Sequence, residues 1–523
     1  MAVQQLLRGA RLVTHSSSLT SATVTTTAIA RVKAANAYSA ISLYSTSGMP
    51  QSFSHPAHHS ATTNPSSALS KIESAVCFSR HPLSSPPASN PSSIPGSSLK
   101  EQYWRNVKVW EHVTESEFTS YKWQVSNTID RRDKLSKFLS DVLPSKIPPR
   151  RQRQQSRSVE TTISRDAFLI DVLDGMKIAP MSVRLTPHIL SVVNWADPFN
   201  DPICRQFLPL KSTMKPDHPA LTLDSLHETD DSPVPGLVHR YPEKVLFLAT
   251  SVCPVYCRFC TRSYAVGSNT ESVTKNSMKP TRKRWEAMFE YISTNPQIQD
   301  VVVSGGDSYY LSPDHLRMIG ERLLAMPNIK RFRFATKGLA VNPTRILDRS
   351  DGWTDNFIQL SEKGRSMGKQ VAMHTHFNHP NEIAWVTEEA ARFLFARGVT
   401  VRNQSVLLHG VNDDLDTMSK LIRKLADLNI QPYYVYQGDL VRGVEDLRTP
   451  LSVILDLEKR IRGTIAGFMM PSFVVDLPGG GGKRLATSFE SYDESTGVST
   501  WKAPGVTGDE AFEYYDPIRS ESA

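Results

Sequence analysis

Three cysteines within one short segment are the strongest chemical signal in this chain. Cys253, Cys257 and Cys260 are spaced C-x3-C-x2-C and follow the apolar run VLFLA at 245–249. A structural zinc site usually has four ligands and paired C-x2-C units. A [4Fe–4S] cluster held by three cysteines instead leaves one iron open to another ligand. The spacing therefore favours an iron–sulfur cluster, and the alternative is incidental or zinc-binding cysteines.

A lysine that follows four glycines is the second signal, in the segment DLPGGGGK at 476–483. The phosphate loop G-x4-G-K-[ST] does not fit, because Leu477 stands at the first glycine position and Arg484 follows the lysine. Such a lysine can instead form a Schiff base with pyridoxal phosphate, since the amine needs room to reach the aldehyde. Taken alone, the segment also fits a flexible surface loop.

Short apolar runs alternate with helix-like stretches around these residues. The runs that predict buried strands are 245–249, 300–304, 331–335, 371–375, 401–408 and 432–437. The stretches that predict helices between them are 282–293, 314–325, 356–363, 382–396 and 414–428. Six such units in series indicate an α/β fold with a parallel sheet and right-handed crossovers. Ligands of such sheets bind at the carboxyl ends of the strands, where the cysteines lie.

The cysteine spacing after the first strand resembles that of radical S-adenosylmethionine enzymes. Together with DLPGGGGK about 220 residues later, it resembles the lysine 2,3-aminomutase family. The resemblance covers Tyr103 to Gly505 and includes FTSYKWQ, HRYPEKVL, CRFCTR, VSGGD, HTHFNHPNEI, NQSVLLHGVND, YYVYQGDL and LRTPLS. It implies a partial (βα)6 TIM-like barrel of the radical S-adenosylmethionine type, with a helical N-terminal region and a C-terminal extension.

The resemblance also implies cofactors and the residues that bind them. Cys253, Cys257 and Cys260 would hold a [4Fe–4S] cluster, and Lys483 would carry pyridoxal 5'-phosphate. The residues expected to bind the pyridoxal phosphate besides Lys483 are Arg240, Tyr241 and Lys244. The residues expected to contact S-adenosyl-L-methionine are Gly305, Gly306, Asp307, His376 and Gln404. Small residues such as the two glycines let a backbone approach a ligand closely.

Charge predicts the class of substrate. By the resemblance, Arg262 would clamp the carboxylate of an amino acid, and Asp439 and Asp476 match the family's acidic pair for a distal ammonium. Two carboxylates can offset one desolvated ammonium, whereas they would repel a glutamate side chain. The alternatives are a surface salt bridge for Arg262 and turn or capping roles for the two aspartates.

The implied activity is that of an isomerase, L-lysine 2,3-aminomutase. A 5'-deoxyadenosyl radical from S-adenosylmethionine would take a hydrogen from C3 of lysine, and the amino group would migrate to give β-lysine. One alternative is an aminomutase for another cationic amino acid, such as arginine. Another is an inactive relative that serves as an iron–sulfur or pyridoxal-binding protein. The reaction implies an electron donor, which the sequence does not identify.

Several positions depart from the family pattern. Lys244 stands where the family usually has Arg. The lysine keeps the positive charge but cannot bind an anion through two N–H groups as arginine does. Lys337 also replaces a frequent Arg, and Ser263-Tyr264 replaces more basic residues. Asp414 follows GVND and no cysteine follows Cys260, so we expect no structural zinc, and a homo-oligomer would have to form without zinc at its subunit contacts.

The composition predicts a cellular location and gives no support for nucleic acid or a membrane as a partner. Of the net charge of +8 over 523 residues, +5 comes from residues 1–72, which contain no acid. The rest has 55 basic against 52 acidic residues, which gives no case for nucleic acid. No apolar run approaches the ~20 residues of a membrane helix. The Arg-, Ser- and Thr-rich start is typical of a mitochondrial transit peptide and predicts a matrix location, with the cytoplasm as the alternative.

The predicted organisation has five parts. They are a disordered transit peptide and Ser/Pro-rich linker (1–100), a helical region (101–240), the barrel (241–440), a C-terminal region with the lysine loop (441–510) and a tail (511–523). A basic solvated linker is expected at 148–157, and Cys77 and Cys204 are expected to be free thiols.

Overall fold

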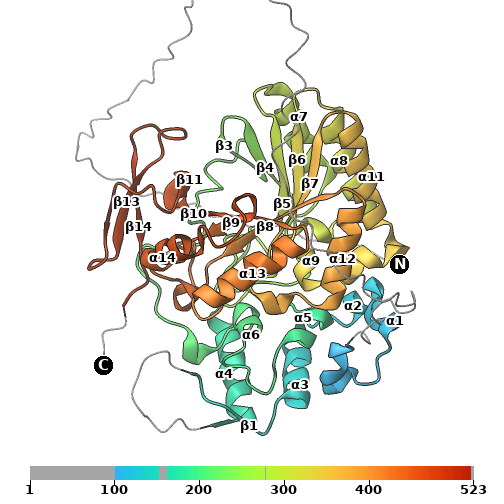
Figure 1. The fold of residues 1–523 in the computed structure, drawn as a ribbon, viewed down its shortest axis with the longest axis vertical. Coiled ribbons are helices and arrows are strands. Elements are labelled where there is room, and N and C mark those ends of the chain that lie inside the picture. Colours follow the sequence, from blue (N-terminus) through green and yellow to red (C-terminus); the bar gives the residue numbers. More distant parts are fainter. Residues whose placement is uncertain (1–100, 152–161, 277, 520–523) are drawn as a thin grey trace, which may run out of the picture. The chain divides into compact units, whose positions relative to one another are not determined.

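In the computed structural model, the predicted strands join in one nine-stranded sheet (Figure 1). The structure describes residues 101–151, 162–276 and 278–519. The predicted transit peptide and Ser/Pro-rich segment, Cys77 and most of the basic linker lie outside the described residues.

Six parallel strands form the centre of the sheet, and each overlaps one predicted run. They are β4 (Lys244–Thr250), β5 (Asp300–Gly305), β6 (Arg331–Ala335), β7 (Gln370–Thr375), β8 (Thr400–Val406) and β9 (Gln431–Tyr436). Each pairs in parallel with the next. The predicted partial (βα)6 barrel is therefore confirmed.

Three further strands extend this sheet at its two edges. β3 (Leu237–Tyr241) pairs antiparallel with β4, β10 (Ser472–Leu477) pairs in parallel with β9, and β11 (Gly482–Leu485) pairs antiparallel with β10. The two edge strands approach each other, because the backbone N–H of Lys483 on β11 donates to the Tyr241 hydroxyl on β3 at 3.1 Å. The sheet thus curls round until its edges meet, and we call this contact the seam.

Helices connect the parallel strands. The longer ones are α7 (Arg282–Thr294), α8 (Pro313–Ala325), α11 (Trp353–Ser366), α12 (Trp385–Ala396), α13 (Leu415–Asp427) and α14 (Leu451–Ile461). Capping residues set where α7, α8 and α13 begin, since the side chains of Thr281, Ser312 and Asp414 accept backbone N–H groups of the first turn. Asn429, just beyond α13, has a φ of 57°, a left-handed conformation that ends a helix.

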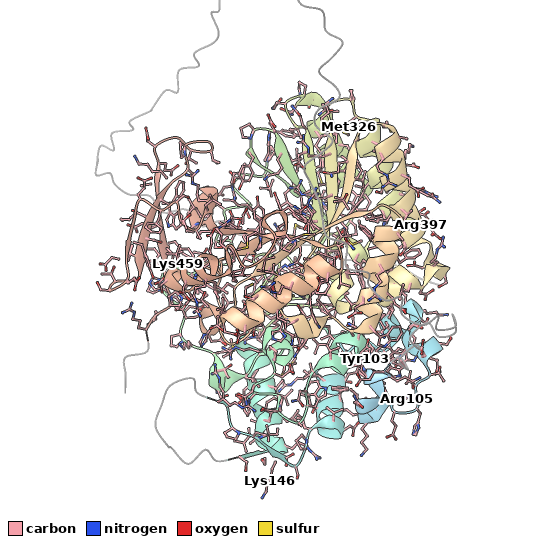
Figure 2. All side chains as sticks on the ribbon, in the orientation of Figure 1. Tyr103, Arg105, Lys146, Met326, Arg397 and Lys459 are labelled. Atoms are coloured by element: carbon pink, nitrogen blue, oxygen red, sulfur yellow. The ribbon has the colours of Figure 1, made fainter. Side chains whose placement is uncertain are left out.

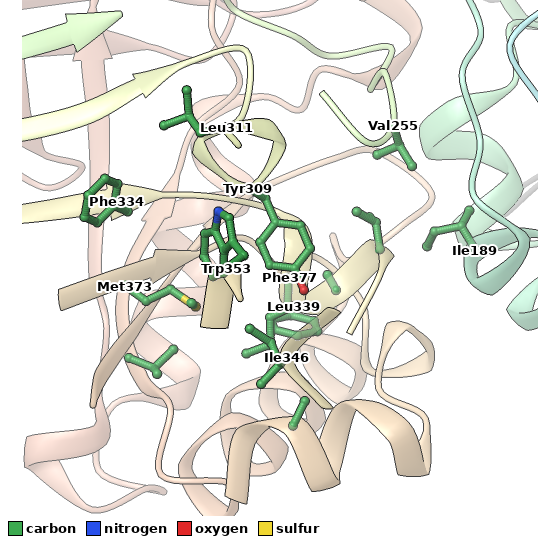
Figure 3. Close-up of a cluster of buried hydrophobic side chains, with 14 of the residues drawn as sticks. Ile189, Val255, Tyr309, Leu311, Phe334, Leu339, Ile346, Trp353, Met373 and Phe377 are labelled. Carbon is green, nitrogen blue, oxygen red and sulfur yellow. The ribbon is translucent and has the colours of Figure 1, made fainter. Parts of the chain in front are cut away.

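The space between the sheet and its helices is filled by large apolar side chains. Trp353 on α11 is fully buried, stacks on Phe357 and meets the ring of Tyr309 edge-on at 4.9 Å. Figure 3 shows Phe334 of β6 and Met373 of β7 in the same cluster. Burying one such side chain stabilises the fold by about 1.5–3 kcal/mol.

The region before the barrel is mainly helical, as predicted. Its elements are η1 (Tyr103–Asn106), η2 (Lys108–Trp110), α1 (Glu115–Phe118), α2 (Tyr121–Ser126), α3 (Arg132–Val142), β1 (Lys146–Ile147), β2 (Ile163–Ser164), α4 (Arg165–Ile178), α5 (Pro187–Val192), α6 (Pro202–Phe207) and η3 (Lys211–Thr213). Aromatic packing holds it together: Trp104 stacks on Phe118 with ring centroids 4.4 Å apart. Tyr103, labelled in Figure 2, shares a 2.7 Å hydrogen bond with the ring of His188.

A three-stranded antiparallel sheet follows the barrel. Its strands are β12 (Ser491–Asp493), β13 (Val498–Lys502) and β14 (Ala511–Tyr515). The predicted tail therefore begins too early, because residues 511–515 form β14. The Tyr514 hydroxyl donates to the carbonyl of Gly438 at 2.7 Å, which ties β14 to the loop after β9. A strand here was not predicted, although Phe512 and Tyr514 alternate with Glu513 as in a half-buried strand, because the run spans only five residues.

The remaining helical elements are short turns. They are η4 (Ser308–Tyr310), α9 (Gly338–Val341), α10 (Thr344–Leu347), η5 (Arg349–Asp351), η6 (Pro380–Glu382), η7 (Glu445–Leu447), η8 (Gly467–Met469) and η9 (Pro478–Gly480). Charged side chains on several elements face solvent, such as Lys146, Arg397 and Lys459 in Figure 2. In the described ranges, no helix combines the length and the apolar character that crossing a membrane requires.

Candidate active site

One cavity of about 370 Å³ collects the chemically important residues. Its walls come from all nine strands of the large sheet and from the loops that follow them. Every residue with a predicted role lines it. These residues are Arg240, Tyr241, Lys244, Cys253, Cys257, Cys260, Arg262, Gly305, Gly306, Asp307, His376, Gln404, Asp439, Asp476 and Lys483. The cysteine trio and the lysine behind the glycines therefore share one hollow.

The cysteine loop, residues 251–267, follows the carboxyl end of β4 and is anchored through Arg258. The backbone N–H of Arg258 donates to the carbonyl of Gln206 at 3.0 Å. Its guanidinium donates to both carboxylate oxygens of Asp446, at 2.8 and 3.3 Å, and both side chains are buried. A buried two-point ion pair of this kind holds the loop in one geometry.

The three thiols are suited to a polynuclear cluster. Burial raises the pKa of Cys253, Cys257 and Cys260, that of Cys257 to about 12, so proton loss must accompany metal binding. Within the described part of the chain, no three His, Cys, Asp or Glu side chains are arranged to hold a single metal ion. In a [4Fe–4S] cluster each cysteine binds its own iron, so the thiols need not converge on one point.

Gly305 and Gly306 serve close packing of the backbone. A Cβ on Gly305, whose φ is +116°, would lie 2.2 Å from the carbonyl oxygen of Thr250, and one on Gly306 would lie 2.6 Å from that of Val252. The glycines thus let the end of β5 press against the start of the cysteine loop. This packing alone explains why both positions are glycine, and their contact with S-adenosylmethionine stays a prediction.

Asp307 is committed to holding two strand ends together. Its carboxylate accepts the backbone N–H groups of Tyr309 and Lys337, each at 2.8 Å. Burial raises the pKa of Asp307 to about 6 in spite of these bonds. Asp307 therefore links the ends of β5 and β6 at the cavity wall.

His376 and Lys337 lie on the same side of the cavity. The His376 ring stacks on Phe259 of the cysteine loop, with centroids 5.7 Å apart, and burial lowers its pKa well below the ordinary value. Its Nε2 atom is buried and has no hydrogen-bond partner among the described residues. The Lys337 ammonium donates to the carbonyl of His376 at 2.8 Å and to Glu382 at 2.7 Å. The ammonium of Lys337 thus has a buried carboxylate and a backbone carbonyl as partners.

The catalytic candidate Lys483 faces Asp476 across a hairpin. β10 and β11 pair so that the two residues are directly opposite. The Lys483 ammonium donates to Oδ2 of Asp476 at 2.5 Å. Burial lowers the pKa of this lysine, but the Asp476 carboxylate more than offsets that effect and leaves the pKa well above its ordinary value. Oδ1 of Asp476 is buried without a partner within the described ranges. One oxygen of this carboxylate is therefore free to accept a further donor.

Arg240 and Tyr241 support the glycine loop. Arg240 donates to Asp231 at 2.7 Å and to the carbonyl of Leu226. The Tyr241 hydroxyl accepts the backbone N–H of Lys483, and its ring packs so close to Gly482 that a Cβ there would lie 3.0 Å from the hydroxyl oxygen. The glycine is needed at this point because its φ is +77°.

Cationic and polar side chains from β4, β6 and β7 line one part of the cavity. The Lys244 ammonium lies 3.9 Å from the centroid of the Tyr241 ring, and burial lowers its pKa to about 8. Arg333 pairs with Asp300 but leaves its buried Nε without a partner among the described residues, and the same holds for Nε2 of His374. These unsatisfied nitrogens suit an anionic group such as a phosphate.

Arg333 and His374 were not among the predicted site residues. They lie in RFRFA and VAMHT, and a charged or polar residue within a predicted buried strand was the available signal. Gln404 lies beside them, with its amide nitrogen 3.1 Å from Nδ1 of His374. Burial and, to a smaller extent, the charges of Arg333 and Arg402 lower the pKa of His374 to about 3, so this ring is neutral at physiological pH.

Asp439 is the second carboxylate near Asp476. It accepts the hydroxyl of Thr261, from the cysteine loop, at 2.6 Å. Burial raises the pKa of Asp439 to about 7, and the charge of Asp476 acts in the same direction. A buried carboxylate whose pKa is raised by a neighbouring carboxylate belongs to a site that gains from a cation.

Arg262 is paired within the protein. Its Nε and Nη2 donate to the two carboxylate oxygens of Glu228 at 2.8 and 2.6 Å, and the Tyr264 hydroxyl donates to the same carboxylate at 3.1 Å. Glu228 also lines the cavity and is 4% exposed. Glu228 was not among the predicted site residues, because an acid in a loop 34 residues before Arg262 gives no local sign of its partner.

Curated proteins with similar sequences were found. The chain is 35% identical to L-lysine 2,3-aminomutase of Acetoanaerobium sticklandii over 378 residues, 72% of this chain and 80% of that protein. It is also 35% identical to L-lysine 2,3-aminomutase of Clostridium subterminale over 380 residues, again 72% and 80%. Glutamate 2,3-aminomutase of Clostridioides difficile is 29% identical over 71% of this chain and 77% of that protein.

The other two comparisons add less. No protein-family model matches the chain. Among solved structures, SuiB of Streptococcus suis bound to S-adenosylmethionine has a TM-score of 0.32 and 14% identity, and the match covers 45% of this chain and 51% of SuiB.

Proposed function

The chain belongs to the L-lysine 2,3-aminomutase family, and from this membership we propose that it converts L-lysine to β-lysine. It is an isomerase that moves an amino group between adjacent carbons of its substrate. Its cofactors are a [4Fe–4S] cluster, S-adenosyl-L-methionine and pyridoxal 5'-phosphate. The observation that supports the substrate best is the pair of carboxylates, Asp439 and Asp476, in the cavity that also holds the thiols and Lys483.

Three parts of the cavity would hold the cofactors. Cys253, Cys257 and Cys260 would hold the cluster, and the wall formed by Gly305, Gly306, Asp307, His376 and Gln404 would face S-adenosylmethionine. Lys483 would carry the pyridoxal phosphate with Arg240, Tyr241 and Lys244 around it. The unpartnered nitrogens of Arg333 and His374 make the same region fit a phosphate. When bound, these groups supply a carbon radical that abstracts hydrogen and a conjugated system that allows the amino group to migrate.

The chain's own residues orient the substrate by charge. Arg262 would bind the α-carboxylate, and the Asp439–Asp476 pair, which lines the same cavity, would bind the distal ammonium. The free Oδ1 of Asp476 can accept a donor even while Oδ2 is paired. A glutamate side chain would meet two carboxylates there, so we propose lysine rather than glutamate, although a glutamate-specific relative is also similar.

The apolar and neutral walls protect the reaction. His374 and His376 are neutral because burial lowers the pKa of both, so they can donate or accept hydrogen bonds without adding charge. Tyr434 and Tyr436 line the cavity beside Lys483, and burial raises the pKa of their hydroxyls. Such a lining excludes water from reactive groups.

The test is anaerobic reconstitution with iron, sulfide, pyridoxal phosphate and S-adenosylmethionine, followed by product analysis with L-lysine and, separately, with L-arginine. We expect β-lysine from lysine. If arginine is converted and lysine is not, the substrate is a cationic amino acid other than lysine. A loaded protein with an iron–sulfur absorption band but no reaction on either substrate would refute the proposal.

Other parts of the proposal concern location and assembly. We propose a mitochondrial location from the acid-free composition of residues 1–72, to be tested by fusing residues 1–100 to a fluorescent protein. We also propose that an electron donor reduces the cluster and that a homo-oligomer forms without the zinc cysteines. The domain boundaries at 100, 240 and 440 remain proposals of the same kind.

A further inference from the structure

Arg262 already has a partner in the protein, and this partner determines which part of its side chain is free. A guanidinium can bind a carboxylate through its Nε–Nη edge or through its two Nη atoms. Glu228 occupies the first edge, with contacts at 2.8 and 2.6 Å. Nη1 makes no hydrogen bond within the described part of the chain, and the side chain is 23% exposed in the cavity wall. The second edge therefore faces the space where a substrate would lie.

Glu228 is held firmly in this position by its own loop, residues 224–232. The Asp224 carboxylate accepts the backbone N–H groups of Glu228 and Thr229, at 3.0 and 2.9 Å. His227, just before Glu228, has a φ of 52°, which is unusual for a residue other than glycine. A backbone conformation of this kind costs free energy and is kept only where the surrounding contacts enforce it.

The same loop also contacts the lysine side of the cavity. The carbonyl of Ser225 accepts the backbone N–H of Gly479 at 2.9 Å. Arg240 donates to Asp231 at 2.7 Å. One short segment therefore touches the arginine that would bind the carboxylate and the glycine loop that carries Lys483.

We propose that Glu228 is a positioning residue for the aminomutase reaction. It holds one edge of Arg262 so that only the other edge is open to the α-carboxylate, and this fixes where the carboxylate and hence C3 of the substrate lie. It also offsets the charge of Arg262, so that the carboxylate is bound in one orientation without being held too tightly to leave. This inference rests on the proposed function of the site.

The loss of the Glu228 charge should separate binding from turnover. In Glu228→Gln, the amide oxygen can still accept from Arg262 but the amide NH2 group cannot, so the two-point hold on the Nε–Nη edge is lost. The repulsion between Glu228 and the substrate carboxylate is also gone. Binding should then be as tight as in the wild type or tighter, while turnover falls because the carboxylate has a choice of positions. Damage to the fold would instead weaken binding and turnover together.

The experiment uses the anaerobic holoenzyme of the full chain. Dissociation constants are measured without reductant for L-lysine and for cadaverine, which keeps the chain and the distal ammonium but has no carboxylate. Turnover of lysine is then measured with reductant. The matched control is Asp230→Asn, which removes one charge from the same loop at a side chain that is 77% exposed. Iron content and melting temperature are recorded for every variant.

For Glu228→Gln we expect kcat to fall at least tenfold, a lysine Kd no weaker than that of the wild type, and a cadaverine Kd within twofold. Asp230→Asn should change none of these. If Glu228→Gln does not load iron, Glu228→Asp serves instead, and kcat should again fall while Kd stays within twofold. An unchanged kcat, or lysine and cadaverine losing affinity together, would overturn the inference. A wild-type enzyme that neither binds nor converts lysine would instead refute the proposed function.

Discussion

The pH dependence of lysine binding provides a direct test of the acidic pair. The pKa of Asp439 is raised to about 7, first by burial and then by the charge of Asp476. An acid with such a pKa is mostly neutral at pH 6 and mostly ionised at pH 8. The substrate ammonium binds the ionised form, so affinity for lysine should increase as the pH rises through 7.

The size of the effect follows from the fraction that is ionised. For a group with a pKa near 7 that must be charged to bind, the apparent Kd should be about tenfold weaker at pH 6 than at pH 8. Neither cavity histidine contributes a competing change here, because the pKa of His374 is about 3 and that of His376 is also well below its ordinary value. Lys244, with a pKa of about 8, loses its charge above this range and should weaken phosphate retention there.

The assay is KM and Kd for L-lysine between pH 6 and 8.5 under anaerobic conditions. Asp439→Asn should remove the acidic limb and weaken binding by about 1.5–3 kcal/mol, the worth of one hydrogen bond to a charged group. Asp476→Asn should move the limb to lower pH, since it removes a charge that raises the pKa of Asp439. A wild-type profile that is flat, or an Asp439→Asn profile with the same limb, would refute the reasoning.

Three further substitutions test other parts of the site. Lys483→Ala should abolish mutase turnover and pyridoxal phosphate retention while some S-adenosylmethionine cleavage persists, and retained turnover would contradict its assignment. Gly305→Ala should lower the melting temperature and iron content, because its Cβ would lie 2.2 Å from the Thr250 oxygen at a φ of +116°, and normal iron loading would argue against this close packing. Asp446→Asn should destabilise the fold by about 3–5 kcal/mol, measured by denaturant unfolding, since it leaves the buried Arg258 without its ion-pair partner.

The strand–helix order of the barrel was predictable because most of the buried strands are short runs rich in apolar residues that alternate with helix-like stretches. The three cysteines and Lys483 were also predictable, since their spacing carries the signal. Partnerships between distant residues were not, because nothing local links Glu228 to Arg262 or Tyr241 to Lys483. Short capped turns and the alternating strand β14 were missed for a related reason: their stability comes from contacts such as that of Tyr514 with Gly438.

The seam between β3 and β11 has a consequence for access to the cavity. Neighbouring strands elsewhere in the sheet share a ladder of backbone bonds, each worth about 1 kcal/mol. The two edges are instead joined by the backbone N–H of Lys483, which donates to the Tyr241 hydroxyl. The weakest line of the barrel wall thus runs beside the lysine that must exchange its ligands. If β3 and β11 separate transiently, the ligands of Lys483 can enter and leave while the paired strands of the rest of the sheet stay in place.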